Sequence, residues 1–134
     1  MQARVTWDKG LAFVGETGSG HRLAIDGARQ AGASPMELML LGLGGCSSVD
    51  VVMILGRMRQ PVTGCVCAID AERAAEDPKV FTRIHLHYRV AGAGLDPAKV
   101  ARAIALSAQK YCSASIMLGK TAALSHDFEL AAPS

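Results

Sequence analysis

Residues 34–59 read Ser-Pro-Met-Glu-Leu-Met-Leu-Leu-Gly-Leu-Gly-Gly-Cys-Ser-Ser-Val-Asp-Val-Val-Met-Ile-Leu-Gly-Arg-Met-Arg. Ser34 is a typical helix N-cap, and Pro35 suits the first helical position, where no amide hydrogen is needed. Glu37 falls near the positive end of the helix dipole and Arg57 near its negative end. Apolar residues occur on every side of this segment, so the sequence predicts a long central helix that is buried all round.

The middle of this predicted helix interrupts the apolar pattern. Gly42, Gly44 and Gly45 come directly before Cys46, although each glycine costs a helix interior about 0.5–1 kcal/mol relative to alanine. Such a cost is reasonable where another backbone or a ligand comes close. Asp50 follows Cys46 by four residues, so the two side chains are expected on one face of the helix.

The bulk composition predicts a single α+β domain over residues 1–134. The 14 basic and 12 acidic residues are spread evenly and give a net charge of +2, which favours neither nucleic acid nor a membrane surface as a partner. Glu37 and Asp50 argue against a membrane span. Without an apolar leader, the four cysteines are expected to be reduced thiols in a cytoplasmic protein.

The remaining segments predict short strands, one further helix and a long connector. The strand patterns cover residues 3–7, 11–15, 21–26, 62–72, 79–90 and 122–130. Residues 97–110 predict a helix followed by a short apolar turn to Gly119, and residues 27–33 predict a flexible connector. We therefore expect antiparallel sheets packed on the central helix, with a second copy of the chain covering its other face in an intertwined homodimer.

Two pairs of possible metal ligands occur on the two longer strands. Cys65 and Cys67 share one face of their strand, as do His85 and His87 of the next one. Alternation along that second strand predicts one core face and one largely solvated face. The first consists of Val80, Thr82, Ile84, Leu86, Tyr88 and Val90, and the second of Phe81, Arg83, His85, His87 and Arg89. The four groups converge only if the register places both pairs on the same side of the sheet, which the sequence leaves open. A metal site is the alternative reading of these residues, which otherwise are buried cysteines and solvated histidines.

A further set, Ser125, His126 and Asp127, has the residue types of a hydrolase triad. Neighbouring residues on a strand alternate between its two faces, so the three side chains are not expected to meet.

Several blocks of sequence resemble a known family. Pro-Met-Glu-Leu at 35–38, Leu-Gly-Gly-Cys at 43–46 and Tyr-Cys-Ser at 111–113 are similar to the OsmC/Ohr family (osmotically induced protein C and organic hydroperoxide resistance proteins), and to its small YhfA-like branch. The resemblance covers essentially the whole chain. It implies the OsmC-like α+β dimer, with the two central helices back to back and two sites at the dimer interface.

The resemblance also implies thiol-dependent reduction of organic hydroperoxides without a cofactor. Carried over by position, Cys46 is the peroxidatic thiol and Cys112 the resolving thiol, which condenses with a sulfenic acid to form a disulfide. A dithiol or a lipoylated protein then reduces that disulfide. The expected apolar walls of the substrate pocket are Met36, Met39, Leu43, Met53 and Ile54.

The sequence departs from the family pattern at one position. Hydroperoxide-reducing relatives have a glutamate directly after the proline, where this chain has Met36, and Glu37 beside it would face roughly away from Cys46. Arg22 is the candidate for the activating cation, with Arg4 as the alternative. Met36 in place of the acid supports a second interpretation, in which the chain is a catalytically weak or inactive protein that binds a small ligand.

Overall fold

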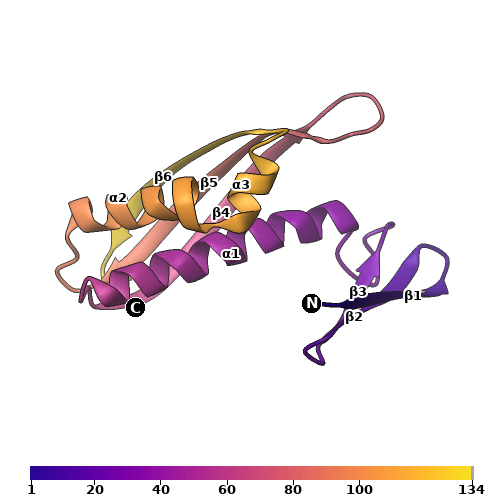
Figure 1. Cartoon of the computed structure of the whole chain (residues 1–134), viewed down its shortest axis with the longest axis horizontal. Helices are drawn as coiled ribbons and strands as arrows, with labels where there is room; N and C mark the ends of the chain where they lie inside the picture. The colour runs from indigo at the N-terminus through magenta and orange to yellow at the C-terminus, as the bar shows by residue number, and fades with distance from the viewer. Residues whose placement is uncertain (134) are drawn as a thin grey trace. The chain divides into compact units, whose positions relative to one another are not determined.

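The computed structural model describes residues 1–133, which form two compact units, one from Met1 to Leu41 and one from Gly42 onward (Figure 1). The long helix α1 (Pro35–Arg57) begins in the first unit and continues through the second. The last residue of the predicted single domain, Ser134, lies outside the described residues, and that single domain stays a prediction.

The first unit is the predicted three-stranded meander. Strands β1 (Ala3–Lys9), β2 (Ala12–Thr17) and β3 (Arg22–Asp26) pair antiparallel in chain order. Gly10 and Gly20 occupy the two turns with φ of 55° and 92°, a backbone region that a residue without Cβ adopts at no steric cost. The strand predictions are confirmed, with ends that differ by one or two residues.

The connector from β3 to α1 is tied down rather than flexible. The buried carboxylate of Asp26 accepts hydrogen bonds from the backbone N–H groups of Ala28, Gln30 and Ala31 at 2.8, 3.2 and 2.9 Å. These bonds hold the pKa of Asp26 below its usual range, and the bond from Ala31 contributes most to this effect. The expectation of a flexible segment was wrong, because the Asp26 side chain accepts hydrogen bonds from three backbone amides of this loop and so fixes its course.

The second unit contains a mixed sheet. Strands β4 (Val62–Arg73) and β5 (Phe81–Gly92) pair antiparallel as predicted, but β6 (Ala123–Ala131) pairs parallel to β5. The expectation of antiparallel sheets was therefore wrong for this pair. A parallel pair needs a long crossover connection, and the helices between β5 and β6 provide it.

The crossover contains two short helices joined by a π-helical turn. Helix α2 (Pro97–Leu106) is capped by Asp96, the π turn covers Ser107–Tyr111, and α3 covers Ser113–Leu118. The helix predicted over residues 97–110 is therefore present, with its last part π-helical up to Tyr111. The expected apolar turn to Gly119 is helical instead. Figure 1 shows α2 and α3 beside α1 in front of the sheet, and side-chain hydrogen bonds link α1 to the π turn and to β5.

The core of the second unit lies between its helices and the inner face of its sheet. It consists of Leu43, Val51, Leu55, Ile84, Leu86, Tyr88, Val90, Val100, Ala103 and Ile104, all at most 4% exposed. This confirms the predicted inward face of β5 from Ile84 onward. The prediction that Phe81 faces solvent was wrong. Phe81 is buried, because an irregularity between Glu72 and Arg73 shifts the register at that end of the β4–β5 pair.

Helix α1 is buried on one face only within this chain. Leu41, Val49, Val52 and Met53 are 45–63% exposed, so the expectation of burial all round is not met by a single copy. The helix has the length and mean hydropathy of a membrane span. Its inner face nevertheless packs into a protein core, which is the arrangement of a core helix in a soluble domain.

The glycines of α1 have different surroundings. A Cβ on Gly44 would lie 2.6 Å from Cδ1 of Ile69, so β4 approaches the helix there through a side chain rather than a backbone. Around Gly42 and Gly45, an added Cβ would meet no heavy atom within 4 Å. Among the residues that the structure describes, the expected close approach is therefore found at Gly44 and not at Gly42 or Gly45.

Candidate functional site

The fold brings together two thiols that are far apart in the sequence. Cys46 comes from α1 and is half-buried, while Cys112 precedes α3 and is fully buried. Burial is the main cause that raises the pKa of the Cys112 thiol, and interaction with the Cys46 side chain raises it further. Both residues are free thiols.

Cys112 owes its position to the break between the π turn and α3. Its backbone is extended, with φ −77° and ψ 103°, and its Sγ accepts the N–H of Ser115 at 3.3 Å as the N-cap of α3. Ser115 lowers the pKa of Cys112, but burial outweighs this effect. The resting side chain is therefore a thiol, held at the junction of two helical segments.

A second pair of thiols faces the same interior. Cys67 lies directly opposite Tyr88 across the β4–β5 pair. Burial, with a smaller contribution from Cys65, raises the pKa of Cys67 to about 11, and contacts with Tyr88 and Ser48 only partly oppose this. Burial also raises the pKa of Cys65. Thiols held in the protonated form are poor nucleophiles, so these two behave as core residues.

Three buried hydroxyl groups form a row beside the thiols. The hydroxyls of Ser47 and Tyr88 are hydrogen-bonded, Ser47 Oγ lies 3.1 Å from Ser107 Oγ, and Ser107 donates to Asp50 Oδ2 at 3.1 Å. The three hydroxyl-bearing residues are at most 2% exposed. Sequence reasoning missed this hydroxyl row: the strand pattern turned Tyr88 inward, but nothing in the sequence pairs Ser47 with Ser107.

Within the second unit, the predicted pocket residues do not line one cavity. Leu43 is fully buried in the core, whereas Met53 and Ile54 line a cavity of about 320 Å³. The other walls of this cavity are Asp50, Arg57, Met58, Leu106 and Tyr111. Met36 and Met39 belong to the first unit, where Met36 is half-buried and Met39 is 47% exposed.

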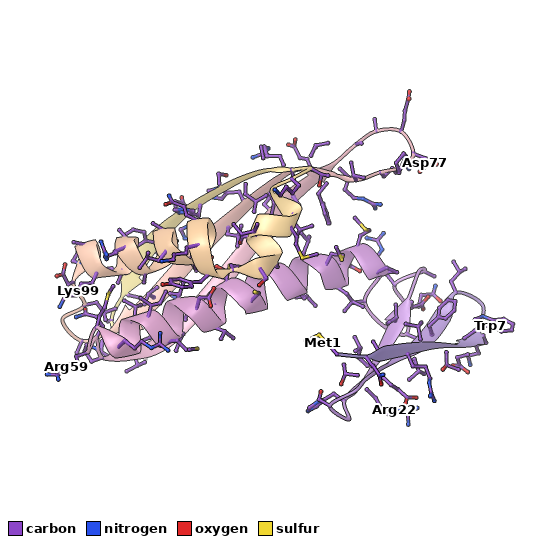
Figure 2. All side chains as sticks on the ribbon, in the orientation of Figure 1. Met1, Trp7, Arg22, Arg59, Asp77 and Lys99 are labelled. Carbon is purple, nitrogen blue, oxygen red and sulfur yellow. The ribbon has the colours of Figure 1, made fainter. Side chains whose placement is uncertain are left out.

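The predicted supporting residues of the first unit have local partners. Arg22 extends from β3 into solvent 3.9 Å from Glu16 (Figure 2), and Arg4 is exposed on β1. Glu37 forms a capping box, in which its carboxylate accepts the Ser34 N–H at 2.9 Å and its own N–H donates to Ser34 Oγ at 3.3 Å. These contacts lower the pKa of Glu37.

A larger cavity of about 620 Å³ lies between the π turn, α3 and the strands β5 and β6. Its walls are Leu86, Tyr88, Ala108, Gln109, Ser115, Ile116, Gly119, Lys120, Ala122, Ala123, Leu124, Ser125 and His126. The backbone N–H of Ser115 also donates to Cys112 Sγ. The cavity therefore shares one residue with the surroundings of the buried thiol.

The metal reading of Cys65, Cys67, His85 and His87 is wrong. From Gly64 to Glu72 of β4, each residue and its partner on β5 have numbers that sum to 155, as for Cys67 and Tyr88 or Asp70 and His85. With an odd sum, the cysteines face the interior and the histidines face outward. Within residues 1–133 no group of three or more His, Cys, Asp or Glu side chains is placed to hold a metal ion.

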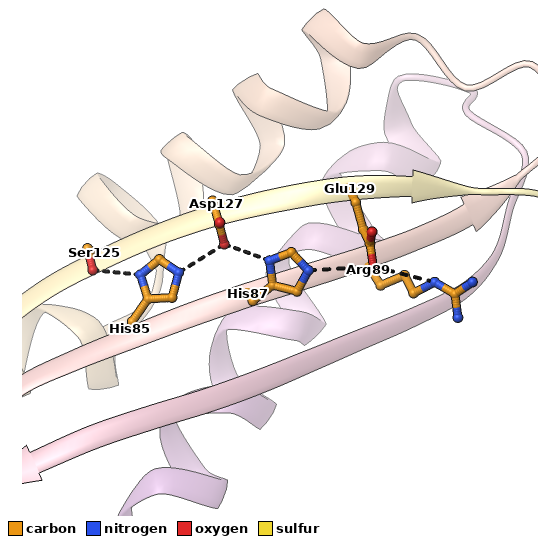
Figure 3. Close-up of polar contacts among 6 residues, drawn as sticks. All are labelled: His85, His87, Arg89, Ser125, Asp127 and Glu129. Atoms are coloured by element: carbon orange, nitrogen blue, oxygen red, sulfur yellow. Dashed lines mark hydrogen bonds and ion pairs between the residues drawn. The ribbon is translucent and has the colours of Figure 1, made fainter.

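The two histidines instead belong to a polar ladder on the outer face of β5 and β6 (Figure 3). Asp127 Oδ1 lies 2.9 Å from His85 Nε2 and 2.7 Å from His87 Nδ1, and Ser125 Oγ lies 2.7 Å from His85 Nδ1. On β6, His126 lies opposite Leu86 of the inner face, whereas Ser125 and Asp127 lie opposite His85 and His87 of the outer face. The prediction that Ser125, His126 and Asp127 form no triad is therefore confirmed, because Ser125 and Asp127 bind His85.

The ladder predicts a specific titration behaviour. Asp127 raises the pKa of His87, with Glu129 adding to the effect against some burial, and the histidines in turn lower the pKa of Asp127. The stabilisation from His87 is present below its ordinary pKa and is lost as pH rises through the raised one. The stabilisation from Asp127 is lost as pH falls through its lowered pKa, so the pair contributes most in mildly acidic solution.

Asp127→Asn is expected to return the pKa of His87 toward its ordinary 6.5, measured by following the imidazole signals by NMR. Ser125→Ala serves as the control, because Ser125 contacts His85 alone in this ladder. An unchanged His87 titration in Asp127→Asn would contradict the assignment.

Comparison with known proteins identifies the family. The OsmC-like protein family matches residues 27–127. Protein YhfA of Escherichia coli strain K12 is 48% identical over 133 residues, which cover 98% of this chain and 99% of that protein. A crystal structure of a hypothetical protein from Aquifex aeolicus VF5 has a TM-score of 0.90 at 26% identity, covering 99% of this chain and 97% of that one.

The organic hydroperoxide resistance protein OhrB of Bacillus subtilis shares the fold, with a TM-score of 0.66 and 17% identity over 96% of this chain and 98% of that one. The resemblance inferred from the sequence blocks and the OsmC-like α+β fold are both confirmed. Since the family match spans most of the chain and the E. coli relative covers nearly all of it, the chain belongs to the OsmC-like protein family.

Proposed function

We propose that this protein reduces organic hydroperoxides with Cys46 as the peroxidatic thiol and Cys112 as the resolving thiol. The observation that carries the proposal is the interaction between these two side chains, which lie 66 positions apart in the sequence and on different helical segments. Membership of a family with a redox or peroxide-related role supports the same reading, as does the fold shared with a named hydroperoxide resistance protein.

The proposed cycle balances without a cofactor. The Cys46 thiolate attacks the distal oxygen of ROOH, the O–O bond breaks, and the alcohol ROH leaves after taking one proton. The Cys112 thiolate then attacks the sulfur of the Cys46 sulfenic acid, which forms the disulfide and releases hydroxide, protonated to water. A dithiol or a lipoylated protein returns two electrons and two protons and restores both thiols.

The same proposal includes a cytoplasmic homodimer in which Arg22 provides the activating cation. A stripe of exposed residues runs along α1. It is about 120° wide around the helix axis, since each residue of an α-helix is rotated by about 100° from the one before. Its members are Leu41, Gly42, Gly45, Val49, Val52, Met53 and Gly56. Glycines on such a stripe let a second helix approach closely, and the aliphatic side chains gain by leaving water. Cys46 borders this stripe, which favours a site at the edge of the dimer interface.

Stoichiometric oxidation tests the proposed activity. One equivalent of cumene hydroperoxide is expected to convert Cys46 and Cys112 into an intrachain disulfide, detected by peptide mass mapping after alkylation of the remaining thiols. Cys65 and Cys67 are the internal controls: burial keeps them protonated, so they are expected to stay reduced and to be alkylated once the protein is denatured. Four alkylatable cysteines after treatment would remove the peroxidase proposal.

The cavity of about 620 Å³ favours a second candidate, a protein that binds a small ligand without turnover. Its volume suits a small molecule, and Lys120 is the one formally charged residue among its walls. Binding of the anionic apolar dye 8-anilinonaphthalene-1-sulfonate that is equal in wild type and Cys46→Ser, together with no peroxide consumption by wild type, would favour this candidate over the peroxidase.

A further inference from the structure

One buried serine connects the two segments that carry Cys46 and Cys112. Ser107 is the first residue of the π turn and is fully buried. Its backbone carbonyl accepts the N–H of Cys112 at 2.8 Å. Its side chain contacts α1 at Ser47, the residue that directly follows Cys46. A single residue thus binds both the turn of α1 next to one thiol and the backbone of the other.

The link between the Ser107 side chain and α1 does not depend on where the hydroxyl hydrogen points. Ser107 Oγ lies 3.1 Å from Ser47 Oγ, 3.4 Å from the Ser47 carbonyl oxygen and 3.1 Å from Asp50 Oδ2. A hydroxyl donates one hydrogen bond and accepts others. Since all three oxygens belong to one turn of α1, Ser107 binds that turn whichever of them takes its hydrogen.

The same turn of α1 is also held from the sheet. The Ser47 hydroxyl is hydrogen-bonded to the hydroxyl of Tyr88 on β5, and both residues are at most 2% exposed. Water cannot replace these bonds without entering the core, so breaking one of them leaves a buried polar group unpaired. The backbone next to Cys46 is therefore fixed against both the π turn and β5.

Cys112 is held at three points on the other side of Ser107. Its N–H donates to the Ser107 carbonyl, its own carbonyl accepts the N–H of Ile116 at 3.1 Å, and its Sγ accepts the N–H of Ser115 at 3.3 Å. The bond to Ser107 spans five residues, as in a π-helix, where an α-helical bond would go to Ala108. The π turn thereby sets the position of Cys112 relative to Ser107.

Disulfide formation is sensitive to such positions. A disulfide requires two Cα atoms roughly 4.4–6.8 Å apart and a narrow range of dihedral angles. Two groups that are held in a productive geometry also react as if each were present at a very high concentration. Bonds that fix both cysteines against one residue therefore favour the disulfide between them.

We propose that Ser107 is the positioning residue of the resolving step, and that its hydroxyl and its carbonyl together hold Cys46 and Cys112 at the spacing at which their disulfide forms. Ser107 takes no part in bond making: Cys112 Sγ bonds to the sulfur of the Cys46 sulfenic acid, and the oxygen leaves as water. The inference rests on the proposed function and deepens it, because it assigns the residue that aligns the two thiols.

The disulfide equilibrium with glutathione tests the inference without peroxide. Two protein thiols and one glutathione disulfide give the Cys46–Cys112 disulfide and two molecules of glutathione. The protein is equilibrated anaerobically at a series of glutathione ratios, quenched with acid and alkylated after denaturation, and peptide mass mapping gives the oxidised fraction of this pair. The equilibrium constant compares two folded states, so a loss of stability that both states share does not change it.

Ser107→Ala is expected to lower this equilibrium constant about tenfold, because the link from the π turn to α1 is lost and the spacing of the thiols is no longer fixed. Ser47→Ala removes one of the partners of Ser107 and is expected to lower it by less. The double variant is expected to match Ser107→Ala alone, because the Ser47 hydroxyl acts through its contact with Ser107.

Ser48→Ala is the matched control. It makes the same atomic change at a half-buried serine one position further along α1, whereas Ser107 bonds to Ser47 and Asp50. This variant is expected to keep the equilibrium constant of the parent, and circular dichroism checks the fold of each protein.

The inference is overturned if Ser107→Ala matches Ser48→Ala, or if the losses in Ser47→Ala and Ser107→Ala add up in the double variant. A parent that forms no Cys46–Cys112 disulfide at any glutathione ratio would overturn it as well. Peroxide consumption judges the peroxidase proposal separately. A parent that forms the disulfide without consuming peroxide would remove that proposal alone.

Discussion

Cys46→Ser is expected to abolish peroxide consumption, with a loss of at least about 10³-fold in kcat/KM, because a serine hydroxyl is a far weaker nucleophile than a thiolate at neutral pH. The measurement is the disappearance of cumene hydroperoxide with dithiothreitol as the reductant. Cys67→Ser is the matched control, since it makes the same atomic change at a neighbouring thiol whose pKa is raised to about 11. Equal losses in the two variants would contradict the assigned nucleophile.

Cys112→Ser separates the two half-reactions. It is expected to leave the first oxidation of Cys46 intact, since the attacking sulfur is still present, and to let a sulfenic acid accumulate that dimedone traps. Wild type is expected to give little trapped product, because Cys112 interacts with Cys46 and condenses with it. Dimedone labelling that is equally strong in both proteins would show that Cys112 does not resolve the sulfenic acid.

The parts of the fold that could be predicted are those set by local signals. The N-cap and proline at 34–35 correctly start α1, and the glycine turns correctly separate the strands of the first unit. Alternation along β5 correctly turns Tyr88 inward. Each of these features depends on residues a few positions apart, which a single sequence displays.

The parts that could not be predicted depend on pairing between distant segments. The parallel β5–β6 pair, the odd register sum that separates Cys67 from His85, and the burial of Phe81 all follow from strand register. Periodicity shows which residues share a face but leaves the partner strand and its offset open. The same limit hid the hydroxyl row, which joins residues from α1, β5 and the π turn.

The candidate site also contains residues that the sequence singles out and residues whose role it leaves open. The resemblance singles out Cys46 and Cys112, and the Cys46 side chain is among the groups that raise the pKa of Cys112. Their catalytic roles stay a prediction. The supporting residues are different: Glu37 caps α1 and Arg22 lies beside Glu16 in the first unit. Their proposed part in thiol activation stays a prediction, and it depends on what a second copy of the chain contributes.

Val49→Glu is expected to dissociate the proposed homodimer, because it places a charge in the exposed apolar stripe of α1. An unpaired charge buried at an interface costs about 3–5 kcal/mol, which corresponds to a dissociation constant raised by at least about 10²-fold. Two-fold symmetry brings two such charges into one interface, which increases the effect. Light scattering coupled to size-exclusion chromatography measures the mass across a dilution series.

Val66→Glu is a closely matched control. Val49 and Val66 are both 59% exposed in the isolated chain, but Val66 lies on β4, outside the stripe. If α1 forms the interface, the first variant runs as a monomer at concentrations where the second remains a dimer. Because Cys46 borders the stripe, the monomeric variant is also expected to lose peroxidase activity, and full activity in that monomer would show that one chain holds a complete site.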